Sequence, residues 1–252
     1  MSQSELQLSD IFSVDKDGKP TIKIVLFGPT LAGKTSMLTV FNALRRMEDP
    51  DLIVSSLTKI QEYGRTVFFD HSVFQTPPFK GKKFDRLRYH LWTVPGEERH
   101  KAQRDIVMRG VDAVLLFLNF EKTAWDLNVK TVKEAKAKIG EKFGKKIPVV
   151  AYINKSDLPP EQRTDKRAFI TFLQDIAAIP KENVANYIMT GSCLNARNDL
   201  LTILKSENRD EYLENERLKT SKRPDSVWLV VRPIQKLTQL VVQQRMEVLQ
   251  GI

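Results

Sequence analysis

The sequence predicts an α/β fold in which a mainly parallel sheet is covered by helices on both faces. Apolar, strand-like runs alternate with helix-length segments along most of the chain, which is typical of this architecture. The 252 residues, 41% of them hydrophobic, are enough for one large domain with a full core. The single cysteine, Cys193, excludes an internal disulfide framework and favours a reducing compartment.

Six strands and several connecting helices are expected. The strand-like runs are 21–27, 66–74, 85–92, 112–120, 147–153 and 185–191. The second and third are separated by a turn rich in proline and lysine, which predicts an antiparallel hairpin. The helical segments are 35–46, 98–109, 124–142 and 165–178. We therefore expect a six-stranded, mostly parallel sheet.

The two ends of the chain depart from this alternation. Residues 1–20 form an N-terminal extension, and the domain itself spans 21–252. Within it, 195–226 is predicted to be a charged insertion, either a solvated helical hairpin or a partly disordered loop. Apolar residues then recur on one helical face, which predicts a final core-packing helix over 233–250 with Pro233 in its first turn.

The net charge of +9 allows several partners. It would suit nucleic acid, an anionic membrane surface or an acidic partner; the alternative is a solvated basic surface with no specific partner. The chain has no signal peptide pattern, no apolar run of bilayer length, no Gly at position 2 for myristoylation and no C-terminal Cys for prenylation. We expect a cytoplasmic protein with at most peripheral membrane contact.

Residues 28–35 carry the first chemical motif, G-x-x-x-x-G-K-T, between an apolar strand and a helix. In such a loop, successive backbone N–H groups turn inward around phosphates, and the following helix adds its positive end. Lys34 would reach the β- and γ-phosphates, and the Thr35 hydroxyl would ligate Mg²⁺. The predicted phosphate-binding residues are Gly28, Thr30, Ala32, Gly33, Lys34, Thr35 and Ser36.

A second motif, Asn154-Lys155-Ser156-Asp157, follows the apolar strand at 147–153. The Asp157 carboxylate can accept hydrogen bonds from guanine N1–H and N2–H₂, whereas adenine lacks that pair and would leave the carboxylate unpaired. The Lys155 stem would cover the base, and Asn154 would brace the phosphate loop. The spacing of the two motifs, two strand–helix units apart at one sheet edge, predicts a guanine-nucleotide site.

The order of motifs resembles the Ras-like small GTPases: GPTLAGKT, then WTVPGEE, then NKSD, then Thr190-Gly191-Ser192. The resemblance covers about residues 20–193 and the final helix. It implies that Thr190-Gly191-Ser192 is the loop whose backbone touches the guanine O6, with Ser192 and Cys193 as candidate binding residues; the alternative for Cys193 is a small packed residue. The strings T-V-P-G at 93–96 and R-T-x-F-F-D at 65–70 are similar to the MglA-type GTPases of bacteria and archaea, which set cell polarity and motility.

The same resemblance assigns roles in the two switch segments. Thr66 would meet Mg²⁺ and the γ-phosphate, and the Gly96 N–H would bond the γ-phosphate. Arg65 would be either a built-in arginine finger or a solvated switch arginine. Glu97 replaces the usual glutamine and would swing away, act as a base, or leave that work to Glu98. Thr93, in place of the usual Asp, weakens support for the metal.

These residues predict a small GTPase switch that binds GTP or GDP with Mg²⁺ and hydrolyses GTP slowly, assisted by a partner. Gly96, Arg65 and Glu97 are the candidate catalytic residues. Effector and regulator proteins would bind at the switch regions, and the resemblance suggests a Roadblock-domain regulator. Two alternatives stay open: a GTP-binding scaffold with little hydrolysis, and a nucleic-acid-associated P-loop protein favoured only by charge. Of these, we do not expect nucleic acid to be a partner.

Overall fold

The computed structural model describes residues 11–62, 65–76, 86–94, 101–177 and 179–250. Its centre is an 8-stranded sheet in the order β3-β4-β5-β2-β6-β7-β8, with β1 paired to β2. The strands are β1 (Ser13–Val14), β2 (Pro20–Phe27), β3 (Ile53–Glu62), β4 (Arg65–Gln75), β5 (Arg88–Thr93), β6 (Ala113–Asn119), β7 (Val149–Asn154) and β8 (Ile188–Thr190). The strands β5, β2, β6, β7 and β8 are parallel to one another. The expected α/β architecture is confirmed.

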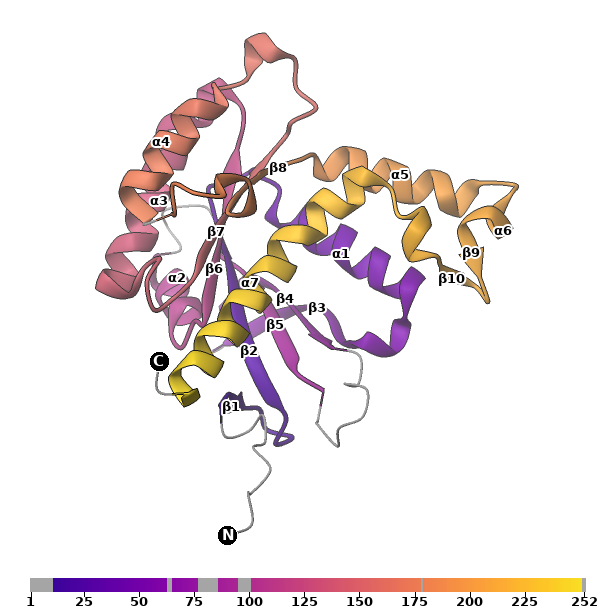
Figure 1. Cartoon of the computed structure of the whole chain (residues 1–252), viewed down its shortest axis with the longest axis horizontal. Coiled ribbons are helices and arrows are strands. Elements are labelled where there is room, and N and C mark those ends of the chain that lie inside the picture. Colours follow the sequence, from indigo (N-terminus) through magenta and orange to yellow (C-terminus); the bar gives the residue numbers. More distant parts are fainter. Residues whose placement is uncertain (1–10, 63–64, 77–85, 95–100, 178, 251–252) are drawn as a thin grey trace.

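Helices cover both faces of the sheet (Figure 1). One face packs against α1 (Lys34–Glu48), α5 (Cys193–Lys205) and α7 (Asp225–Gln250). The other packs against α2 (Lys101–Met108), α3 (Trp125–Ile139) and α4 (Lys166–Ala177). All seven residues of β6 are buried because this strand lies between two layers, which explains its unbroken apolar run. The central strands thereby hold the loops at their ends in fixed positions.

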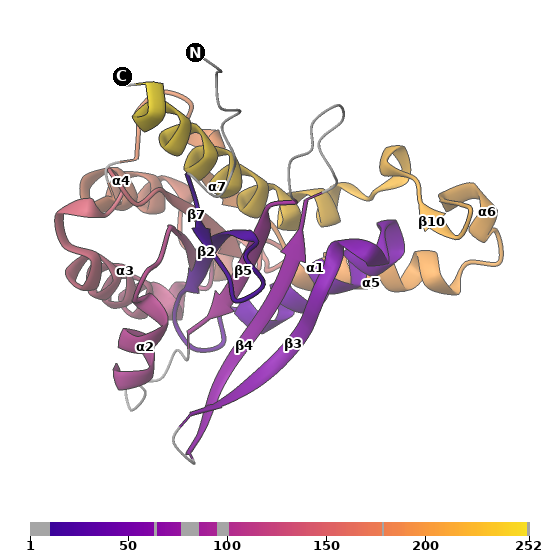
Figure 2. The same cartoon turned by 90° about the horizontal axis from the view of Figure 1, so that it is seen from below.

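The expected hairpin is present, because β4 and β5 pair antiparallel with His71 opposite Trp92 and Gln75 opposite Arg88. Two strands extend the sheet beyond the expected six. β3 pairs antiparallel with β4 through an irregular register, and the pair reaches out from the rest of the sheet (Figure 2). β1 pairs with the start of β2. The sequence of β3 mixes apolar with polar residues, which an edge strand tolerates because only one side is paired.

The last helix begins at Asp225, so Pro233 lies inside it rather than in its first turn. Val227 and Val230 are buried, and they lie on the same apolar face of the helix as the buried Ile234 and Leu237. Burial of each such side chain contributes about 1.5–3 kcal/mol, which is comparable to the cost of about 3 kcal/mol for proline within a helix. Packing therefore extends the helix through the proline.

The region before α7 contains the end of α5, then α6 (Arg209–Tyr212), β9 (Leu213–Glu214), β10 (Arg217–Leu218) and a 3-10 turn at Thr220–Lys222. These elements form an arm at the side of the molecule (Figure 1). Leu218 is 4% exposed and belongs to the core beside α1, and Arg223 is ion-paired with Glu48 of α1. The arm is thus attached to the domain by packing and by charge.

Among the residues described, no helix combines the length and apolar character needed to cross a bilayer.

Candidate nucleotide-binding site

The loop at 28–35 leaves the carboxyl end of β2 and leads into α1. A Cβ added at residue 28 would lie 1.9 Å from the Phe117 carbonyl oxygen, so only glycine fits between the loop and β6. Gly33 caps α1 with a φ of 104°, which favours glycine. α1 is described over its whole length and has no side-chain hydrogen bond at this cap. Its first N–H groups therefore face the loop, as an anion-binding helix end requires.

Lys34 is buried within this loop. Its ammonium donates to the carbonyl oxygens of Gly28 at 2.8 Å and Pro29 at 2.7 Å. Burial and, to a smaller extent, the positive charge of Arg104 lower the pKa of Lys34 to about 8. An anion beside this amine would restore the charged form. The residues present thus fit the phosphate groups of a nucleotide.

The base-side loop is tied directly to the phosphate-side loop. Asn154 is buried, and its Nδ2 donates to the carbonyl oxygen of Ala32 at 2.7 Å. Its Oδ1 accepts from the Cys193 backbone N–H at 2.9 Å. The Ser156 N–H donates to the Gly191 carbonyl oxygen at 3.1 Å. Three segments far apart in sequence therefore meet at one edge of the sheet, at the carboxyl ends of β2, β7 and β8.

The remaining base-side residues lie around this junction. Lys155 has a φ of 68°, and its ammonium pairs with Glu121 at 3.2 Å. Asp157 is exposed at the edge. Ser192 caps α5 by accepting from the Asn195 N–H at 3.1 Å. Cys193 is buried, and burial raises the pKa of its thiol to about 12, while its backbone N–H is held by Asn154.

A carboxylate stands beside the predicted magnesium ligand. The Thr35 hydroxyl donates to Asp70 Oδ2 at 2.5 Å. The buried Thr93 hydroxyl donates to the same oxygen at 3.3 Å and accepts from the Asp70 N–H at 3.1 Å. The negative charge that Thr93 lacks is thus supplied from the neighbouring strand β4. Carboxylate and hydroxyl oxygens are ligands that Mg²⁺ prefers, so the donor set fits this metal.

Sequence reasoning gave Asp70 no role, although it ends the R-T-x-F-F-D string. The sequence did carry a signal for this role: position 93 has threonine where Ras-like proteins usually have aspartate, and the R-T-x-F-F-D string offers another carboxylate. Arg104 was also missed. It is 5% exposed in α2 and lies 3.1 Å from Glu134 of α3, and its charge acts on Lys34. Nothing in a single helix sequence indicates which of its arginines is buried.

The switch residues are only partly described. Arg65 and Thr66 lie in β4, opposite Glu62 and Gln61 of β3, and their side chains lie outside the described part of the chain. Gly96 and Glu97 also lie outside the described residues. Thr30 and Ser36 are exposed on the phosphate-side loop and the start of α1. The predicted functions of all these residues stay predictions.

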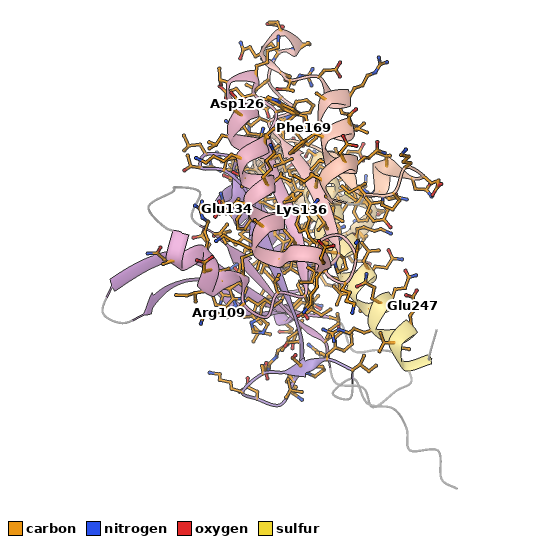
Figure 3. All side chains as sticks on the ribbon, turned by 90° about the vertical axis from the view of Figure 1, so that its left-hand side faces the viewer. Arg109, Asp126, Glu134, Lys136, Phe169 and Glu247 are labelled. Carbon is orange, nitrogen blue, oxygen red and sulfur yellow. The ribbon has the colours of Figure 1, made fainter. Side chains whose placement is uncertain are left out.

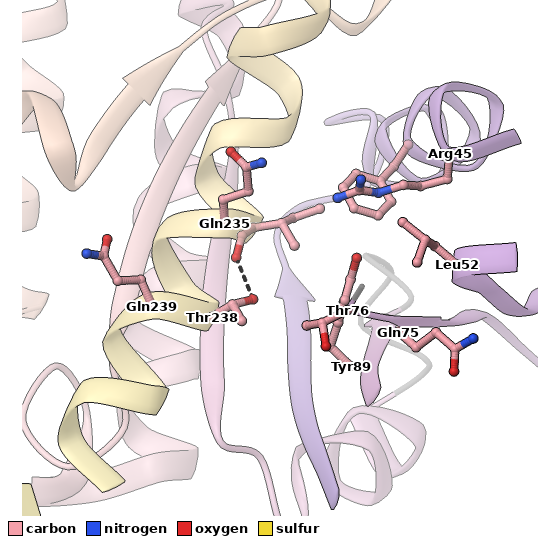
Figure 4. A pocket seen from close by; sticks show the side chains of 10 residues that line it. Arg45, Leu52, Gln75, Thr76, Tyr89, Gln235, Thr238 and Gln239 are labelled. Carbon is pink, nitrogen blue, oxygen red and sulfur yellow. Dashed lines mark hydrogen bonds between the residues drawn. The ribbon is translucent and has the colours of Figure 1, made fainter. Parts of the chain in front are cut away.

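A separate groove of about 300 Å³ lies between α1, α7, the end of β4 and the start of β5 (Figure 4). Phe41, Tyr89 and Ile234 form its apolar part, and Gln235 and Thr238 contribute polar groups. None of its lining residues belongs to the predicted nucleotide site. The candidate site is therefore defined by the loops at the sheet edge.

The sheet order, the glycine-lysine loop at the end of β2 and the junction through Asn154 together define a Ras-like P-loop domain. No protein-family model matches the chain. The chain is 32% identical over 139 residues to the mutual gliding-motility protein MglA of Myxococcus xanthus, covering 54% of this chain and 68% of that protein. It is also 23% identical over 140 residues to an uncharacterized protein of Methanocaldococcus jannaschii, covering 56% of this chain and 73% of that one. The chain belongs to the MglA-type branch of the Ras-like small GTPases.

Proposed function

We propose that this protein is a GTP/GDP switch that holds its nucleotide with Mg²⁺ and hydrolyses GTP slowly unless a partner assists. The observation that carries the proposal is the double hydrogen bond of Asn154, to Ala32 and to Cys193, because it joins the phosphate end and the base end of the site. Family membership supports a GTPase switch in general.

At the phosphate end, Lys34 and the N–H groups at the start of α1 would hold the phosphates. Thr35 and Thr66 would bind Mg²⁺, and Asp70 would orient the Thr35 hydroxyl and add negative charge near the metal. Mg²⁺, when bound, supplies charge neutralisation at the β- and γ-phosphates. At the base end, Asp157 would accept from guanine, with Lys155, Ser192 and Cys193 lining the base.

Hydrolysis would depend on Arg65 and on the residues around Gly96. A built-in arginine stabilises charge on the transferring phosphoryl group and contributes about 10³–10⁵ in rate in this class of enzyme. Glu97 brings a second negative charge toward the γ-phosphate, which disfavours fast unaided cleavage. We therefore propose intrinsic turnover of about 10⁻⁴ to 10⁻² s⁻¹.

The partners we propose are effector and regulator proteins that read the switch segments, with a Roadblock-domain protein as the regulator. The Myxococcus xanthus relative is named for mutual gliding motility. By analogy we propose a role in cell polarity for this chain, acting in the cytoplasm.

Single-turnover GTP cleavage by the purified chain tests the proposal. We expect the native chain alone to cleave GTP slowly in Mg²⁺. In the presence of a regulator, the cleavage rate of Arg65→Ala should be about 10³-fold below that of the native chain. The native chain and the variant should both retain bound nucleotide. Glu97→Gln tests the role of this carboxylate: a slower variant identifies Glu97 as a catalytic group of a switch, and a faster variant identifies it as the charge that restrains cleavage. A native chain and a variant that both stay silent would indicate a scaffold instead. Native cleavage faster than about 1 s⁻¹ without a partner would contradict the proposal.

A further inference from the structure

Five exposed lysines lie on the second half of α3 and on the loop after it, which leads to the edge of the sheet opposite the nucleotide site. We call this surface the basic end; it consists of Lys133, Lys136, Lys142, Lys145 and Lys146. β6 and β7 begin at this edge, and α3 and α7 end there. Because the parallel strands all run the same way, their carboxyl ends, with the loop at 28–35, lie at the other edge.

The basic end is not neutralised by its own acidic residues. The segment 126–146 contains seven lysines, no arginine and three acidic residues. Of the acidic residues, Glu134 lies within ion-pair distance of Arg104 and Lys138. Glu141 is 3.5 Å from Lys145, but its side chain is 98% exposed, and such pairs are weak in water. Glu247, near the end of α7, adds one more negative charge, so the five lysines face Glu141 and Glu247 and the surface keeps a positive excess.

Interaction with the partial negative charge at the end of α3 does not explain all of these lysines. Cations in the last turn of a helix offset its partial negative charge. Lys136 and Lys138 lie in the last turn of α3 and can act in this way. Lys142, Lys145 and Lys146 come after that turn. Their charges extend the surface beyond what the helix requires.

Apolar side chains lie next to the lysines. The Gln244 amide donates to the Lys145 carbonyl oxygen at 2.9 Å, which fixes the last turns of α7 beside the loop at 144–147. On these turns Met246 is 38% exposed and Val248 is 77% exposed. Figure 3 labels Lys136 on α3 and Glu247 on the last turns of α7. A basic surface with apolar side chains at its border results.

We propose that the basic end is a peripheral docking surface for an anionic phospholipid membrane. Lysine acts as a strongly hydrated point charge, which suits attraction to a diffuse anionic surface, whereas bidentate recognition of a defined group favours arginine. Exposed Val248 and Met246 would enter the headgroup region beside the lysines. Docking through this edge leaves the nucleotide edge and the β3–β4 pair facing away from the lipid, where a partner protein can reach them.

Vesicle sedimentation of the full chain tests this surface. The native chain should partition onto phosphatidylcholine vesicles with about one-third phosphatidylserine far more than onto pure phosphatidylcholine, and high salt should remove most of the binding. Each lysine near such a surface contributes about fivefold, so Lys142→Gln/Lys145→Gln/Lys146→Gln should lower the partition coefficient about a hundredfold. Val248→Ser should reduce the part of the binding that survives high salt.

The matched control is Lys166→Gln/Lys205→Gln/Lys222→Gln, which removes the same charge from exposed positions at the start of α4 and in the arm, outside the basic end. It should keep most of the native partitioning. Three results would overturn the proposal: equal binding to neutral and anionic vesicles, an equal loss in the control, or no vesicle binding by a native chain that binds heparin or an acidic protein through these lysines. Nucleotide affinity should be unchanged in all variants. A variant that loses vesicle binding but keeps its nucleotide affinity therefore reports on the basic end and not on the nucleotide site.

Discussion

Asp70→Asn should weaken the hold of Mg²⁺ on the bound nucleotide. The native carboxylate accepts from the Thr35 hydroxyl at 2.5 Å and from the Thr93 hydroxyl at 3.3 Å. A hydrogen bond to a charged group contributes about 1.5–3 kcal/mol, and the shorter of these two bonds is the stronger. The expected loss in Mg²⁺ affinity is therefore about 10- to 100-fold, which agrees with the usual effect of residues that orient metal ligands.

The assay is release of a fluorescent GDP analogue at graded free Mg²⁺. The native chain and Asp70→Asn should release nucleotide equally fast without metal, and the variant should need about 10- to 100-fold more Mg²⁺ to slow release. Thr93→Asp in the Asp70→Asn background returns a carboxylate to the buried position at the end of β5 and should recover part of the loss. An unchanged Mg²⁺ midpoint for Asp70→Asn would refute this account of the metal site.

Three further predictions concern the loops themselves. Asn154→Ala leaves a buried carbonyl of the phosphate loop and a buried N–H of the base loop unpaired, so stability measured by denaturant should fall by about 2–4 kcal/mol and GDP affinity should fall with it. Gly28→Ala places a Cβ 1.9 Å from the Phe117 carbonyl oxygen. Chemical denaturation should therefore show that the free energy of unfolding falls by more than about 3 kcal/mol, or that no folded protein forms. A free energy of unfolding within about 1 kcal/mol of the native value would contradict the observed packing. The pKa of Lys34 is about 8 in the free protein, and bound phosphates favour its charged form. Calorimetry should therefore show a constant GDP affinity well below pH 8 and a decline of up to tenfold per pH unit above pH 8. Binding should also be accompanied by proton uptake in that upper range.

Most of the fold follows from sequence periodicity. The buried strand β6 is a continuous apolar run, and such runs alternating with helical patterns predict a parallel sheet between helices. The edge strand β3 was not predicted because its polar residues follow no clear alternation. The start of α7 was placed at Pro233 because proline favours a first turn, but burial of Val227 and Val230 extends the helix back to Asp225.

The candidate site was predictable where its chemistry lies in contiguous residues. The phosphate loop and the N-K-x-D string each carry their spacing in the sequence. The Asp70–Thr35 contact joins strand β4 to helix α1, and the burial of Arg104 depends on how α2 packs against α3. Such contacts arise from tertiary packing, which a single sequence does not display.

The central claim is that Lys34 and Asp157 lie at opposite ends of one guanosine phosphate. Calorimetry with GDP, ADP and xanthosine diphosphate tests it most directly on the native chain and on Asp157→Asn. The native chain should prefer GDP over ADP by about 10⁴-fold or more, because adenine leaves the carboxylate unpaired. The variant should shift toward xanthosine diphosphate, since an amide N–H₂ can donate to the oxygen that replaces the guanine amine. Equal affinity of the native chain for GDP and ADP would contradict the account.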